Sequence, residues 1–189
     1  MIQPMPNTVA FVAHCMLNQN SKTDGGALCP GVYSPLVEVL REQGARIEQM
    51  PCPELGFLGL NRFWAVKEQL DTTVYRRHCR RLAAVVAGMI DAHLDAGSDV
   101  VIIGLEGSPT MGVRITCSNE GWGGRPDAGD SYRLVPGRGI FLEEIEAELA
   151  SRGRETPRAM GIAHQFPDHD PAVERAQLEA LLHGGNGAR

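Results

Sequence analysis

Short apolar runs alternate along the chain with longer segments in which apolar residues recur at helical spacing. The runs predict strands at residues 9–13, 46–50, 100–105 and 158–162. The third is the clearest, because Val100–Leu105 is a β-branched run of the kind that is buried on both faces of a sheet. The helical spacing predicts helices at residues 33–43, 72–96, 139–150 and 171–182.

This alternation predicts an α/β fold in three layers, with a mostly parallel sheet of about four strands and helices on both faces. The 189 residues suit one domain with a single core, and no repeat or linker divides them. We expect a loose tail at residues 184–189. One irregular stretch, Glu106–Arg138, contains seven glycines. Loops of that length in a compact domain are usually functional or mobile.

Charge and hydropathy narrow the classes of function. The formal net charge of −5 disfavours binding to a nucleic-acid polymer, which requires a positive face. No apolar run approaches the ~20 residues of a membrane span. Residues 1–8 contain neither a basic segment nor an apolar signal core. We therefore expect a cytoplasmic protein without a membrane partner, and a homodimer is left open.

The five cysteines, at positions 15, 29, 52, 79 and 117, are an odd number in a chain without an export signal. That usage argues against a disulfide scaffold and for reduced thiols, metal ligands or a nucleophile. The absence of a Cys-x-x-Cys pair excludes a zinc ribbon and a bacterial-ferredoxin cluster. Cys79 lies inside the basic run Arg76–Arg81 of a predicted helix and is interpreted as a packing residue.

The predicted strand ends carry the residues with the most evident chemistry. The first strand ends at His14–Cys15, the second before Cys52 and Glu54, the third before Ser108, and the fourth before His164. Ligands of open parallel sheets bind at the carboxyl ends of the strands, so we expect these residues to meet. Thiolates from separate strand ends could hold a metal or an iron–sulfur cluster with an open coordination position. Buried structural cysteines are the alternative.

The segments around these residues resemble the motifs of the thiouracil desulfidase family. The resemblance covers roughly residues 8 to 165, and the first two motifs together make it specific. The similar segments are, in chain order, His14–Lys22, Pro51–Glu54, Gly59–Arg62, Gly107–Val113, Thr116–Ser118 and Gly121–Gly124, the last two matching an extension found in one branch.

The resemblance implies a [4Fe-4S] cluster held by three cysteines, with a fourth iron that takes sulfur from a thiolated nucleobase. On this chain it makes Cys15 and Cys52 cluster ligands, Glu54 the proton-transfer carboxylate and Ser108 a polar residue near the open iron. The third cysteine of the family falls at Met111. A neutral thioether is a much poorer ligand than a thiolate, so this is a departure from the pattern.

Cys117, six residues further along the same loop, is our expected replacement for the third ligand. Cys29, a different metal and an incomplete site are the alternatives. Trp122 could stack on a flat heterocycle. The histidines at strand ends, His14 and His164, are candidate proton donors. Three polar residues beyond the first cysteine could donate hydrogen bonds to the cluster or the substrate: Asn18, Ser21 and Lys22.

The sequence therefore predicts a cytoplasmic, [4Fe-4S]-dependent desulfidase that acts on a small thiolated compound such as a thiobase. Two other hypotheses stand beside it. The departure at Met111 motivates a non-catalytic or redox-sensing binding domain with a degenerate cluster site. A zinc- or thiol-dependent hydrolase would use Cys15, Cys52 and a histidine.

Overall fold

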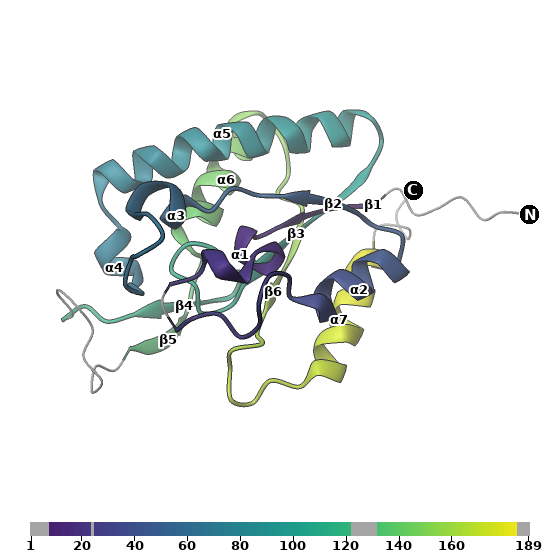
Figure 1. Ribbon diagram of the computed structural model, residues 1–189. Helices are drawn as coiled ribbons and strands as arrows, with labels where there is room; N and C mark the ends of the chain where they lie inside the picture. The colour runs from purple at the N-terminus through teal and green to yellow at the C-terminus, as the bar shows by residue number, and fades with distance from the viewer. Residues whose placement is uncertain (1–7, 24, 122–131, 185–189) are drawn as a thin grey trace, which may run out of the picture.

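A parallel four-stranded sheet forms the centre of the protein (Figure 1). The computed structural model describes residues 8–23, 25–121 and 132–184. This sheet confirms the predicted α/β fold class, and its four strands lie where the apolar runs predict them. In spatial order they are β2 (Arg46–Gln49), β1 (Thr8–Val12), β3 (Asp99–Leu105) and β6 (Arg158–Ile162).

The two inner strands provide the centre of the core. Every residue of β1 is buried, and so is every residue of β3 except Asp99. Their register pairs Val9 with Val100 and Phe11 with Ile102. Apolar side chains therefore project from both faces of the sheet, and each face requires a covering layer of helices.

Four helices cover the two faces of the sheet. Figure 1 shows α5 (Thr73–Asp95) and α6 (Ile140–Ser151) on one side and α2 (Ser34–Glu42) and α7 (Pro171–His183) on the other. Cys79 is fully buried within the apolar stripe of α5, which agrees with its interpretation as a packing residue. Among the described residues, no helix is both long and apolar enough to cross a membrane.

The basic run at the start of α5 joins that helix to α6. The Arg76 guanidinium contacts Asp71, Glu143 and Glu144, and Arg80 contacts Glu144 at 3.2 Å. These ion pairs give Arg76 and Arg80 a structural role, because their charges are already balanced by carboxylates.

Several short elements escape the sequence pattern. A segment of three to six residues is too short for a helical period or strand alternation to emerge. The expectation of one irregular stretch over Glu106–Arg138 was wrong where an antiparallel ribbon forms. The short elements are α1 (His14–Leu17), η1 (Gln19–Ser21), α3 (Pro53–Leu58), α4 (Lys67–Leu70), β4 (Ile115–Ser118) and β5 (Arg133–Pro136). The predicted tail lies outside the described residues beyond Gly184.

A buried carboxylate fixes the loop that follows β3. Glu106, 1% exposed, accepts hydrogen bonds on Oε2 from the backbone N–H groups of Val113, Arg114 and Ile115, at 3.3, 3.0 and 2.9 Å. A Cβ atom on Gly161 of β6 would lie 2.4 Å from Glu106 Cδ. The sheet can therefore accommodate this carboxylate only because position 161 has no side chain.

We expect Gly161→Ala to lower the free energy of unfolding by about 2 kcal/mol, because overpacking a tight site costs ~1–3 kcal/mol. The Glu106 carboxylate cannot move aside without losing its backbone donors. Gly88→Ala, within α5, is the matched control, since the nearest atom to the added Cβ lies 3.6 Å away. There the same change should raise stability by up to ~1 kcal/mol. Denaturant unfolding measures both variants, and equal stabilities would contradict the expectation.

Candidate functional site

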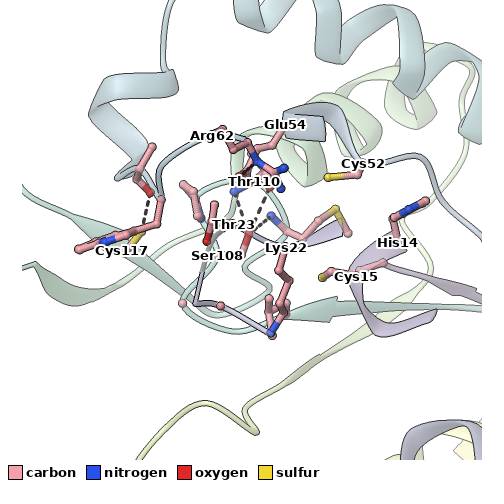
Figure 2. A pocket seen from close by; sticks show the side chains of 18 of the residues that line it. His14, Cys15, Lys22, Thr23, Cys52, Glu54, Arg62, Ser108, Thr110 and Cys117 are labelled. Atoms are coloured by element: carbon pink, nitrogen blue, oxygen red, sulfur yellow. Dashed lines mark hydrogen bonds and ion pairs between the residues drawn. The ribbon is translucent and has the colours of Figure 1, made fainter. Parts of the chain in front are cut away.

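A pocket of about 390 Å³ lies at the carboxyl ends of the strands. His14 and Cys15 reach it from the end of β1, Cys52 from the end of β2, and Ser108 from the end of β3 (Figure 2). Gln165, which follows β6, completes this wall. The expectation that residues from separate strand ends meet at one place is confirmed for the first three strands, whereas His164, expected from the fourth, does not line the pocket.

Cys15 and Cys52 lie on the same side of the pocket, and both sulfurs point into it (Figure 2). Cys15 lies in α1, and Cys52 is the N-cap of α3, where its sulfur accepts a hydrogen bond from the Leu55 N–H at 3.3 Å. The pKa of the Cys15 thiol is raised to about 12, mainly by burial; Lys22 opposes the rise, and Cys52 and Glu54 contribute to it. Burial, followed by the charge of Glu54, also raises the pKa of Cys52. Both thiols therefore hold their protons at neutral pH in the absence of a bound metal ion.

Cys117 lines the same pocket but from the opposite side (Figure 2). It lies in β4, is 3% exposed, and its thiol donates to the Ala65 carbonyl oxygen at 3.5 Å. Met111, at the position where the family has a cysteine, also lines the pocket. Over the described ranges, no three cysteine, histidine, aspartate or glutamate side chains are grouped so as to hold a metal ion. The structure thus brings together two of the three predicted ligands.

Three side chains that line the pocket are joined by hydrogen bonds. The Thr110 hydroxyl donates to Glu54 Oε1 at 2.7 Å, and Ser108 Oγ lies 3.2 Å from Thr110 Oγ1. Since the Thr110 proton is used on Glu54, the Ser108 hydroxyl must donate to Thr110. Ser108 Oγ in turn accepts from the backbone N–H groups of Thr110 and Met111. The sequence analysis singled out Glu54 and Ser108 but missed Thr110, which stands two residues after Ser108 in the same motif.

Arg62 is a second residue that the sequence analysis missed. Although it is only 8% exposed, it lines the pocket. Its Nε lies 3.4 Å from Glu54 Oε2, and its other nitrogens donate to the carbonyl oxygens of Gly59 and Ser21. These contacts hold the Glu54 carboxylate at the pocket wall. The sequence signal that could have identified Arg62 is its position at the end of Gly59–Arg62, a segment that resembles a family motif.

Of the other predicted site residues, some line the pocket and others do not. Lys22 lines the pocket, whereas Asn18 and Ser21 do not: the Ser21 hydroxyl donates to the Asn18 carbonyl oxygen at 2.7 Å within a local turn. Cys29 is also absent from the pocket lining, and its thiol donates to the carbonyl oxygen of Val32. Trp122 lies outside the described residues.

The chain is similar in sequence to an uncharacterized archaeal protein. No protein-family model matches the chain. Over 105 residues the chain is 34% identical to the uncharacterized protein MJ0003 of Methanocaldococcus jannaschii, and the match covers 56% of this chain and 67% of the relative. This chain belongs to the MJ0003 family.

A solved structure described as the [4Fe-4S]-dependent thiouracil desulfidase TudS is also similar. The comparison covers 90% of this chain and 98% of that structure, with 21% identity and a TM-score of 0.48. A likeness of this degree carries no argument about function. The function of this member of the MJ0003 family must therefore be inferred from the residues of its own pocket.

One buried histidine adjoins the pocket in this MJ0003-family protein. His164, 9% exposed, lies with Nε2 3.2 Å from Lys22 Nζ, and its ring stacks on Tyr33 at a centroid distance of 4.6 Å. Burial, and then the charges of Lys22 and His169, lower the pKa of His164 to about 4. The imidazole is therefore neutral at pH 7 and accepts a hydrogen bond from the Lys22 ammonium.

We expect this histidine to make folding sensitive to acid. An unfolded histidine has a pKa of 6.5, so the stability that depends on neutral His164 is complete above pH 6.5 and declines as the pH falls toward 4. The loss should reach about 3 kcal/mol near pH 4. Denaturant unfolding between pH 7 and 4 measures it. His164→Phe should flatten the profile, whereas His183→Gln, an exposed control at the end of α7, should not.

Proposed function

We propose that this protein is an enzyme that removes sulfur from a small thiolated compound, such as a thiobase, inside the pocket. The observation that carries the proposal is the pairing of Cys15 and Cys52 beside the chain from Ser108 through Thr110 to Glu54. Candidate ligands for a thiophilic metal and a candidate proton-transfer carboxylate therefore line the same pocket. Both lie in segments that resemble the motifs of a desulfidase family.

We further propose a [4Fe-4S] cluster as the cofactor, and the chain's residues fit it in part. Cys15 and Cys52 lie on the same side of the pocket, and their raised pKa values mean that a cation must compensate their deprotonation, as a bound metal does. Cys117 in its present position does not fit, because its thiol is directed to the Ala65 carbonyl oxygen. Cys15 and Cys52 would hold the cluster, which would supply a thiophilic iron for the C=S group.

The chemistry assigned to this chain is proton transfer at Glu54. Net desulfuration replaces the sulfur of C=S by the oxygen of one water molecule and releases H₂S, so no external oxidant or reductant is required. Glu54 Oε1, held by the Thr110 hydroxyl, and Oε2, held near Arg62, are positioned to take a proton from that water. Such general-base catalysis typically contributes ~10²–10⁴-fold in rate.

A non-catalytic binding domain is the second candidate, and the position of Cys117 favours it. If the loop that carries β4 never brings this thiol to Cys15 and Cys52, the site has only two cysteine ligands beside the thioether of Met111. Such a domain would bind little iron. Metal analysis therefore separates the two candidates.

After anaerobic reconstitution of the full chain we expect about four iron and four sulfide per protein. Cys15→Ser and Cys52→Ser should each remove most of this iron. Loss of iron in Cys117→Ser would show that the loop carrying Cys117 supplies the third ligand. Met111→Cys should restore the iron content of the Cys117 variant, because it places a thiolate on the pocket wall. Cys29→Ser is the matched control and should retain the wild-type iron content. Negligible iron in folded wild-type protein would exclude the cluster enzyme.

We expect Glu54→Gln to lower kcat for sulfur release from 4-thiouracil by about 10²–10⁴-fold while the iron content stays unchanged. The amide keeps the shape and the contact with Thr110 but cannot take a proton. Glu38→Gln on the exposed face of α2 is the control and should keep full activity. Sulfide assays under anaerobic conditions measure both variants. Activity in Glu54→Gln equal to that of the wild type would remove Glu54 from the proposed reaction.

A further inference from the structure

Lys22 is a cation of the pocket whose charge is not balanced by a carboxylate within the described residues. No described aspartate or glutamate lies within ion-pair distance of its ammonium, which instead lies 3.2 Å from the Nε2 atom of His164. By contrast, Arg62, the other cation on the pocket wall, lies beside Glu54. The pocket therefore contains one compensated and one uncompensated positive charge among the residues that the structure describes.

The position of Lys22 makes its ammonium available to a ligand. Lys22 lines the pocket described above and also an adjoining hollow of about 530 Å³, and Arg62 lines both spaces as well. An ammonium has three protons, and the hydrogen bond to His164 uses one of them. The other two can reach a bound molecule at the junction of the two spaces.

His164 holds this ammonium without cancelling its charge. A neutral imidazole accepts a hydrogen bond from Nζ, whereas a carboxylate at the same place would form an ion pair. The Tyr33 ring, stacked at 4.6 Å and 28°, fixes the plane of the imidazole. Because Nε2 accepts, the ring proton is on Nδ1, which is buried and has no hydrogen-bond partner among the described residues.

That unpartnered nitrogen opposes folding, since a buried polar group without a partner costs ~1–3 kcal/mol. Phenylalanine would stack on Tyr33 without this cost. The imidazole at position 164 is therefore explained by its acceptor nitrogen, which orients Lys22, rather than by packing.

We propose that Lys22 is an anion-binding residue of the pocket and His164 its positioning residue, so that the pocket favours a thiolated ring that carries a negative charge at neutral pH. The thiolated nature of the ligand rests on the proposed function. The charge of the ligand and the role of His164 go beyond it.

The test compares two pyrimidine probes that differ in charge. At neutral pH 2-thiobarbiturate is an anion and 2-thiouracil is neutral, although both carry a C=S group on the same ring. Isothermal titration of the full chain, before and after iron–sulfide reconstitution, gives the two Kd values. We expect wild-type protein to bind the anion about tenfold more tightly or better, as a charged hydrogen bond allows.

Four variants separate charge from packing. Lys22→Met should reduce the ratio of the two Kd values to nearly one. Arg41→Met removes an equal charge from the exposed face of α2 and should leave the ratio unchanged. His164→Phe keeps the ring but lacks the acceptor, so it should lower the ratio about threefold or more by leaving Lys22 unoriented. His164→Gln offers an oxygen acceptor and should recover part of the preference.

An equal affinity of the wild-type protein for the two probes, or a preference that survives Lys22→Met, would overturn the anion site. If the ratio of the two Kd values in His164→Phe equals that of the wild-type protein, the positioning role of His164 is overturned. The titrations before reconstitution involve no turnover, so they are independent of the proposed desulfidase activity. A chain that binds the anion through Lys22 but releases no sulfide would refute the activity and retain the site.

Discussion

The parallel arrangement of the sheet is the constraint on which the rest of the structure depends. Parallel strands place their carboxyl ends at one edge, so segments that follow β1, β2, β3 and β6 must meet there, however far apart they lie in the sequence. The buried pair of β1 and β3 sets the register of this edge. Helices on both faces leave that edge as the place where loops can enclose a pocket.

The loop after β3 is a tightly constrained part of the pocket wall. Glu106 gathers three backbone N–H groups, and Gly104 and Gly161 leave room for the returning chain and for the carboxylate. This anchoring gives Ser108 and Thr110 fixed positions opposite Glu54, which comes from a different strand end. The Glu54 carboxylate therefore has defined hydrogen-bond partners because a buried anion, Glu106, organises the backbone nearby.

The polar groups of the pocket are stabilised in different charge states. The two thiols of Cys15 and Cys52 are neutral where they are buried, Glu54 lies beside Arg62, and Lys22 lies beside an uncharged His164. A soft metal would compensate the thiolates, whereas an anionic ligand would compensate the lysine. These charge states support the proposed metal at the two thiols and the proposed anionic ligand at Lys22.

The sequence by itself determined the α/β class, the four strands, the long helices and the meeting of Cys15, Cys52 and Ser108, because apolar periodicity and parallel topology are sufficient to place strand ends. Only the tertiary structure decided that Cys117 faces Ala65 instead of the paired cysteines, because strand pairing of a short ribbon directs that side chain. It alone also joined Lys22 to His164, 142 positions apart. Such contacts depend on how loops pack, and no local pattern of residues encodes them.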